Sequence, residues 1–271
     1  MSDTGTLSIA ILSGKGGVGK SNVSLNLAYA LHREKPTLLV DCDLGLASLD
    51  VLLGIQTGDT LENLLHSERE AGEIAMELPG SGPSFIPAAS GNYALGQSAA
   101  ALSALFMEKL APYAVNFDYL IMDVGAGVSG PIQVFASMAA LRVVVVTPEP
   151  TSLTDAYALL KIMSSGHGIR DFFILVNQAE SKQEEDLAFS RIATACERFL
   201  GFKPLRLGAI RMDAALPEAV RRQKPLHESA PTSGAAEDFL TLASRLHRLH
   251  GTMQARIEPG TPLRTPNATL L

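Results

Sequence analysis

The segment 13–21 constrains the fold more than any other part of this chain, and its sequence is Ser-Gly-Lys-Gly-Gly-Val-Gly-Lys-Ser. It fits the phosphate-loop pattern G-x-x-x-x-G-K-[S/T], with Gly14, Gly19, Lys20 and Ser21 in the fixed positions. The apolar run before it predicts a buried strand, and apolar residues at helical spacing follow it. A glycine turn between a strand and a helix points backbone N–H groups inward, where they can hold an anion.

This loop predicts a nucleotide site with Mg²⁺, although a glycine turn without a ligand is the alternative. Glycine lets the backbone approach phosphate oxygens that a Cβ would block. Lys20 would neutralise the β- and γ-phosphates, and the Ser21 hydroxyl would ligate Mg²⁺. The residues expected to bind the nucleotide here are Gly14, Lys15, Gly16, Gly17, Val18, Gly19, Lys20, Ser21 and Asn22.

Lys15 directly follows the first glycine of the loop, and a second lysine is not needed to hold phosphates within one subunit. It is either a solvated loop lysine or a cation that reaches the nucleotide of a second copy, as an arginine finger does. A loop with this extra lysine resembles that of the MinD/ParA ATPases. The resemblance implies that two copies dimerise face to face around two ATP molecules, with Lys15 and Lys20 both in catalytic roles.

Two carboxylates, Asp41 and Asp43, follow the strand predicted at 37–40. Strand alternation would put both on one side of its carboxyl end, beside the phosphate loop. There they could position Mg²⁺ and the attacking water, or they could cap a turn or helix. The continuation 44–54 resembles the first switch segment of the FlhG (FleN) proteins, MinD-like ATPases that control flagellar number and placement. By that resemblance, Asp43 orients the hydrolytic water and Asp41 supports the magnesium shell.

A further strand, predicted at 119–122, ends in Asp123, and Gly125 and Gly127 follow. Asp123 would hydrogen-bond a water on the magnesium ion, and the glycines would let the loop rearrange when the γ-phosphate leaves. The alternative is an aspartate that caps the helix at Pro131. The sequence Asp-Val-Gly-Ala-Gly-Val-Ser resembles the second switch segment of the FlhG and MinD proteins.

The most β-branched run, 142–146, predicts a central strand, and a proline-containing segment at 147–157 follows it. Ser152 or Thr151 is expected to cap the next helix. The segment resembles FlhG, and in the wider family the position of Glu149 lies near the dimer interface. A purely structural loop is an equal alternative for Glu149.

Asn177 follows the strand predicted at 172–176, and its amide suits the edge of an adenine ring because it offers both an acceptor and donors. The family resemblance puts a base-contacting Asn at this strand end, whereas an Asn that forms a turn is the alternative. Asp213 follows the strand predicted at 205–210 and is expected to line the base pocket.

Alternation of strands and helices predicts an α/β fold with a mostly parallel sheet covered on both faces, and the resemblance implies a P-loop NTPase of the SIMIBI type. We expect one ATPase domain at 1–250 and a disordered, proline-containing tail at 251–271. The predicted helices lie at 59–66, 99–113, 181–200 and 235–250, and a surface loop at 79–97 surrounds a short strand at 85–86. The segment 216–225 resembles the family's late helix. The last helix would pack on the sheet or, alternatively, contact a partner or a membrane.

Composition excludes several classes of protein. Hydrophobic residues make up 46% of the 271 residues and charged residues 18%, which is typical of a globular protein. Apolar runs such as 143–146 are far shorter than the ~20 residues that cross a bilayer, and the polar start at 1–6 argues against a signal peptide. Cys42 and Cys196 form no C-x-x-C pair, which fits a reducing cytoplasm and disfavours an iron–sulfur carrier. A net charge of −6 argues against broad binding to nucleic acid.

These features together predict an FlhG-type, MinD-like ATPase, cytoplasmic or peripheral at the inner face of the membrane. ATP would drive homodimerisation, hydrolysis would restore the monomer, and partners would distinguish the two. The resemblance implies flagellar basal-body proteins, an FlhF-like GTPase or a transcriptional activator as partners. Only residues 1–6 precede the first strand, so we expect no N-terminal arm that activates FlhF, and the family's lipid-binding helix is not evident. A ParA-like partitioning or positioning ATPase and a non-hydrolysing adaptor are the alternatives.

Overall fold

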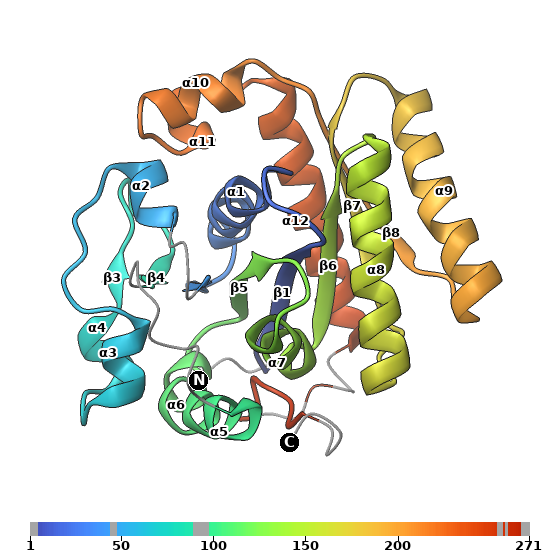
Figure 1. The fold of residues 1–271 in the computed structure, drawn as a ribbon. Coiled ribbons are helices and arrows are strands. Elements are labelled where there is room, and N and C mark those ends of the chain that lie inside the picture. The colour runs from blue at the N-terminus through green and yellow to red at the C-terminus, as the bar shows by residue number, and fades with distance from the viewer. Residues whose placement is uncertain (1–4, 44–47, 89–97, 254–256, 258–259, 267–271) are drawn as a thin grey trace.

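The strands of this chain assemble into a sheet that the computed structural model describes for residues 5–43, 48–88, 98–253, 257 and 260–266. Within those residues the sheet has eight strands in the order β3-β4-β2-β5-β1-β6-β7-β8, and every pairing except β3–β4 is parallel (Figure 1). The strands are β1 (Leu7–Ser13), β2 (Thr37–Cys42), β3 (Met76–Glu77), β4 (Ser84–Ile86), β5 (Tyr119–Ala126), β6 (Leu141–Val146), β7 (Phe173–Ala179) and β8 (Leu205–Arg211). The predicted α/β fold with a mostly parallel sheet is confirmed.

Helices cover both faces of the sheet, as expected for parallel strands joined by crossover connections. One face carries α1, α2 and α10 to α12, and the other carries α3, α5 and α7 to α9. The helices are α1 (Lys20–His32), α2 (Leu49–Leu53), α3 (Leu61–His66), α4 (Ala71–Ile74), α5 (Ala99–Lys109), α6 (Ala111–Ala114), α7 (Gly130–Met138), α8 (Pro150–His167), α9 (Lys182–Leu200), α10 (Ala215–Arg221), α11 (Leu226–Ser229) and α12 (Gly234–Met253).

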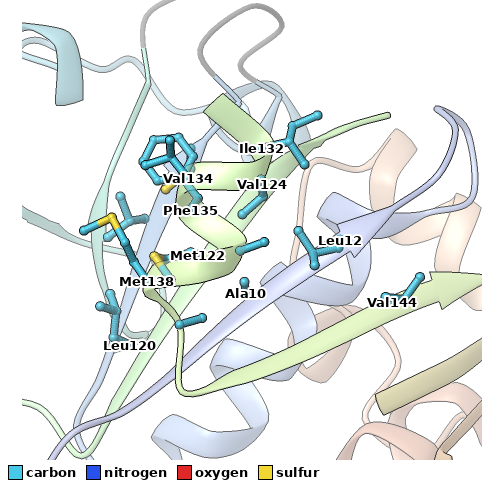
Figure 2. Close-up of a cluster of buried hydrophobic side chains, with 14 of the residues drawn as sticks. Ala10, Leu12, Leu120, Met122, Val124, Ile132, Val134, Phe135, Met138 and Val144 are labelled. Atoms are coloured by element: carbon cyan, nitrogen blue, oxygen red, sulfur yellow. The ribbon is translucent and has the colours of Figure 1, made fainter. Parts of the chain in front are cut away.

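Strand alternation divides the apolar core into two parts. Leu7, Ile9 and Ile11 of β1 face α1 and α12, whereas Ala10 and Leu12 face α7 on the opposite side. Figure 2 shows this second part, in which alternate side chains of β1 and β5 pack against α7. Because both of their faces are buried, the strands β2, β5, β1, β6 and β7 are mostly apolar, whereas the edge strands β3 and β8 are partly exposed. Asp41 and Asp123 lie toward the carboxyl ends of β2 and β5.

Several element boundaries differ from the sequence predictions. The helix predicted at 99–113 is two helices, because Pro112 has no N–H for an interior helical bond and fits only a new first turn. The cap predicted at Ser152 or Thr151 is wrong, since α8 already begins at Pro150, a residue suited to the first helical position. The Ser152 hydroxyl instead accepts a hydrogen bond from the backbone N–H of Thr147.

The C-terminal segment also differs from its prediction where it is described. The α12 helix extends to Met253, and its stripe of apolar residues is buried against the sheet, as the packing interpretation predicted. Leu263 is fully buried, and the backbone N–H of Arg264 donates to the carbonyl of Met138 at the end of α7. The expected disorder at 251–271 therefore does not apply to 260–266, because prolines prevent a helix there but not packing.

Two other predictions lie partly outside the described residues, namely 44–47 of the first switch segment and 89–97 of the surface loop. Within the described residues, no helix combines the length and apolar character needed to cross a membrane.

Candidate functional site

The loop between β1 and α1 has the backbone shape of an anion site. Gly17 and Gly19 have φ angles of +80° and +84°, a left-handed conformation that glycine adopts without a steric cost. The α1 helix begins at Lys20, directly after the loop, so its unpaired N–H groups face the same space. No atom lies within 4 Å of the position a Cβ would take at Gly16 or Gly17, so this side of the loop is open to a ligand.

The first glycine of the loop is required for a different reason, namely close packing against α8. A Cβ at Gly14 would lie 2.1 Å from the carbonyl carbon of Asp155 and 2.3 Å from the backbone nitrogen of Ala156. Since no side chain fits between the loop and α8, this helix fixes the position of the loop.

Replacing Gly14 with alanine should therefore destabilise the nucleotide-free protein by about 1–3 kcal/mol, the usual range for overpacking. Urea unfolding without nucleotide would measure the change. Gly16→Ala is the matched control, because a Cβ there contacts nothing and should leave the midpoint nearly unchanged. Equal shifts for the two variants would contradict the packing argument.

Lys20 and Asp123 form a buried ion pair at the bottom of the loop. Lys20 Nζ lies 2.8 Å from Asp123 Oδ1, and their side chains are 7% and 0% exposed. The hydroxyl of Ser24 donates to the same oxygen at 2.7 Å, and the Ser21 hydroxyl lies 3.4 Å from Lys20 Nζ. The alternative of Asp123 as a cap of α7 is wrong, because α7 begins after Ser129.

The other oxygen of Asp123, Oδ2, is buried and has no hydrogen-bond partner. An unpaired carboxylate oxygen away from solvent is costly, so its position suits a donor such as a water on a bound cation. The residues present therefore fit the predicted Mg²⁺ site.

Asp41 lies directly beside Asp123, because β2 and β5 pair with these two residues in register. It is 1% exposed, and its carboxylate accepts hydrogen bonds from the backbone N–H groups of Asp43 and Ser48. Burial and the neighbouring Asp123 carboxylate raise the pKa of Asp41 to about 7. A divalent cation here would favour the charged form.

Asp43 extends from the end of β2 toward the glycine segment of β5. A Cβ at Gly125 would lie 3.3 Å from Asp43 Oδ1, so the carboxylate lies against the second switch segment of its own chain. The predicted carboxylates Asp41, Asp43 and Asp123 thus meet at the carboxyl ends of neighbouring strands. In the described part of the chain, however, no three His, Cys, Asp or Glu side chains are arranged to hold a metal ion by themselves. A magnesium ion would need phosphate oxygens and the Ser21 hydroxyl as well.

Lys15 belongs to the same loop as Lys20 but has different partners. Its Nζ lies 2.8 Å from Glu149 Oε2 and 2.9 Å from Thr151 Oγ1, at the start of α8. The Lys15 and Glu149 side chains are 30% and 65% exposed, and such surface pairs contribute only about 0–1 kcal/mol. Lys15 is therefore not a freely solvated lysine, and a stronger anion could replace its partners.

Asn177 contacts the phosphate loop from the end of β7. Its Nδ2 donates to the carbonyl of Val18 at 2.8 Å, and its Oδ1 is buried without a hydrogen-bond partner. A Cβ at Gly19 would lie 2.5 Å from Asn177 Nδ2, so loop and amide are closely packed. Asn177 therefore holds the loop in place, and its free acceptor is compatible with the predicted contact to a base.

Asp213 and Asn22 form contacts within the protein. The two Asp213 oxygens accept the N–H groups of Ala215 and Ala235, at the starts of α10 and α12. These backbone hydrogen bonds lower the pKa of Asp213, and they give it a structural role that the sequence did not indicate. Asn22, in the first turn of α1, accepts a hydrogen bond from Asn26. The base-pocket role of Asp213 has no support from these contacts.

Two residues of the site, Ser24 and Thr151, were not predicted from the sequence as site residues. Ser24 lies one helical turn after Lys20, and that spacing on a helix that starts at the loop is a usable signal. Thr151 was considered only as a helix cap, and nothing in its local sequence indicated a contact with Lys15.

A family model described as the CobQ/CobB/MinD/ParA nucleotide binding domain matches residues 9–226. Antiactivator FleN of Pseudomonas aeruginosa is 36% identical over 239 residues, which cover 88% of this chain and 85% of that protein. The flagellum site-determining protein YlxH of Helicobacter pylori is 33% identical over 256 residues, which cover 93% and 83% of the two proteins.

Solved structures show the same fold. The MinD cell division protein of Aquifex aeolicus superposes with a TM-score of 0.72 at 23% identity, over 90% of this chain and 97% of that one. MinD of Pyrococcus horikoshii, solved with Mg-ADP, gives a TM-score of 0.69 at 22% identity, over 91% and 98% of the chains.

Proposed function

This chain belongs to the CobQ/CobB/MinD/ParA family of nucleotide-binding proteins, and from that membership we propose that it is an FlhG-type ATPase switch. ATP binding brings two copies together with both nucleotides between them, and hydrolysis separates them. Partner proteins bind one state and not the other. ATP hydrolysis is a property of the MinD/ParA family, whereas magnesium dependence and stimulation by a partner are part of the proposal.

The main structural support for this proposal is that Lys15 and Lys20, the two lysines of the loop, have different surroundings. Lys20 is buried and paired with Asp123 inside its own site, as a lysine that holds phosphates in cis should be. Lys15 lies at the surface and contacts Glu149 and Thr151 instead of the interior of its own site. A phosphate group of the nucleotide bound to a second copy would pair more strongly with the Lys15 ammonium than the exposed Glu149 carboxylate and the Thr151 hydroxyl do. Lys15 thus acts across the dimer.

The residues of each site have separate roles in this scheme. The loop N–H groups and Lys20 hold the phosphates, and Ser21 together with Asp123 and Asp41 would hold magnesium directly or through water. When bound, the ion neutralises charge on the phosphates. Asp43, at the end of β2 beside Gly125, orients the attacking water and accepts its hydrogen bond.

Replacing Asp43 with alanine should lower ATP turnover by on the order of 100-fold or more, because a positioned water-orienting group contributes about 10²–10⁴ to the rate. ATP binding should persist, since the phosphate contacts come from the loop. Steady-state turnover and calorimetry would measure the two effects. Glu197→Ala, which removes an exposed carboxylate of α9, is the control and should behave like the wild type. Equal rates for the wild type and Asp43→Ala would instead favour a non-hydrolysing adaptor.

The biological role that we propose is control of flagellar number and placement. It is supported by the names of the two relatives, an antiactivator and a flagellum site-determining protein, each matched over more than four fifths of both chains. The ATP-bound dimer would bind a flagellar basal-body protein, an FlhF-like GTPase or a transcriptional activator. Each can be tested by pull-down with ATP-bound Asp43→Ala protein. Retention by Asp43→Ala and not by Lys15→Ala would support a partner, and equal retention would contradict dimer-dependent binding.

A further inference from the structure

A second cavity lies beside α1, away from the phosphate loop. It has a volume of about 520 Å³ and is lined mainly by residues of α1, α11, α12 and the turn between β3 and β4. Lys20 and His32, at the two ends of α1, are about 18 Å apart at 1.5 Å per residue. The lining includes His32 but neither the phosphate loop nor the carboxylates of the nucleotide site, so the cavity is separate from that site.

The apolar part of the lining includes a pair of flat rings. The Tyr29 and His227 rings have centroids 4.4 Å apart and planes tilted by 33°. The Tyr29 hydroxyl donates to the carbonyl of Pro79, which fixes the ring in place. Leu226, Phe239 and Leu240 are also part of the apolar lining. Such a surface suits a planar, largely apolar group.

The polar part of the lining includes a charged side chain that has no ion-pair partner in the part of the chain that the structure describes. Arg33 is exposed at the rim and forms no ion pair with any described residue. Asn26 is different, because its amide already bonds Asn22 and the backbone of Leu226. The cavity therefore offers an unpaired cation beside its rings.

The turn between β3 and β4 is held in an unfavourable conformation where it meets the cavity. Ser81 has a φ of +53°, which costs a non-glycine residue on the order of 1 kcal/mol, and Gly80 beside it has a φ of +70°. A Cβ at Gly82 would lie 2.5 Å from Cε1 of Tyr29, so the turn packs directly against that ring. Positive φ angles at two successive residues are typical of the turn in a β-hairpin, and here that turn forms one wall of the cavity.

We propose that this cavity binds a small molecule with a flat ring and an anionic group. The ring packs against the half-buried His227 ring, which Tyr29 supports from within, and the anion pairs with the guanidinium of Arg33. The volume falls within the ~300–1,000 Å³ of small-molecule sites, and a charge-assisted hydrogen bond to Arg selects the anion. This site is additional to the proposed function and does not depend on ATP hydrolysis.

The test is calorimetric titration with 1-naphthyl phosphate, which carries one flat ring system and one phosphate. The protein is first saturated with Mg-ADP, so that the phosphate loop cannot bind the probe. We expect binding of one probe per chain. Arg33→Gln should weaken it by about tenfold or more, the value of one charge-assisted contact. Arg191→Gln, which removes an exposed arginine of α9, is the matched control and should bind as the wild type does.

A second variant tests the cavity itself. Leu240 is half-buried and lines the cavity, so Leu240→Trp should fill part of the cavity with a larger side chain and abolish binding of the probe. Thermal unfolding would show whether the variant is folded. The probe's parts provide a further comparison, because inorganic phosphate or 1-naphthol alone should each bind at least about tenfold more weakly. Absence of binding to the wild type, equal affinity for Arg33→Gln, or phosphate alone binding as tightly as the probe would overturn the proposal.

Discussion

Replacing Lys15 with alanine is expected to abolish ATP-dependent dimerisation and to lower ATP turnover by on the order of 10³-fold or more, the size of an arginine-finger effect. Lys15 Nζ hydrogen-bonds Glu149 and Thr151 and makes none of the buried contacts of its own nucleotide site. Its proposed role is therefore to contact the nucleotide of the second copy, and alanine removes that contact. ATP should still bind the monomer, because Lys20 and the loop backbone remain. Light scattering with a slowly hydrolysed ATP analogue and a turnover assay would measure both effects.

The matched control for this variant is Lys182→Ala, which removes another exposed lysine at the start of α9. Its dimerisation and turnover should match the wild type, since loss of a surface charge pair has little effect. A normal dimer formed by Lys15→Ala would refute the role of Lys15 across the interface.

The second large effect is expected for Lys20, five residues further along the loop. Lys20→Ala should lower ATP affinity by about 100-fold or more, because removal of one partner from a buried charge pair costs several kcal/mol. The phosphates would lose their cation and would face the unneutralised carboxylate of Asp123. Calorimetric titration with ATP measures the loss, and an unchanged affinity would contradict the assignment of the loop.

The Lys20→Ala variant should also be less stable by about 3–5 kcal/mol, because it leaves a charge buried without its partner. Its control is the double variant Lys20→Ala/Asp123→Asn, which removes the remaining charge. The double variant should regain most of the stability measured by urea unfolding but none of the ATP affinity. This comparison shows whether the loss of ATP affinity is caused by the missing phosphate contact or by the lower stability of the fold.

The sequence alone was sufficient to predict the parts of the site that are determined by a short run of residues or by the ends of parallel strands. The loop from Gly14 to Ser21 could be predicted because a strand, a glycine turn and a helix fix its shape within a few residues. Asp41 and Asp123 could be placed near it because parallel strands end at the same edge of a sheet.

Contacts between distant segments could not be predicted in this way. Lys15 and Glu149 are 134 residues apart, and they meet only because α8 packs directly against Gly14. The bond from Asn177 to Val18 likewise depends on where β7 ends relative to the loop. No local sequence pattern indicates either contact, because each depends on how the whole sheet and its helices pack.

The errors of the sequence predictions have local causes. The cap predicted at Ser152 was wrong because a proline two residues earlier could itself begin the helix. The segment 260–266 was expected to be disordered because prolines exclude a helix, but Leu263 is buried in the core without one. Composition gave no information on this packing.

Mixing two inactive variants tests most directly whether two copies share their sites. In a heterodimer of Lys15→Ala and Asp43→Ala chains, one site keeps its own Asp43 and receives Lys15 from the partner. Lys15→Ala chains should not pair with one another, but they can pair with Asp43→Ala chains, and each such mixed dimer has one working site. Turnover should therefore recover to on the order of a quarter of the wild-type value. If Lys15 acted only within its own chain, the mixture would show no more ATP turnover than the two variants measured separately.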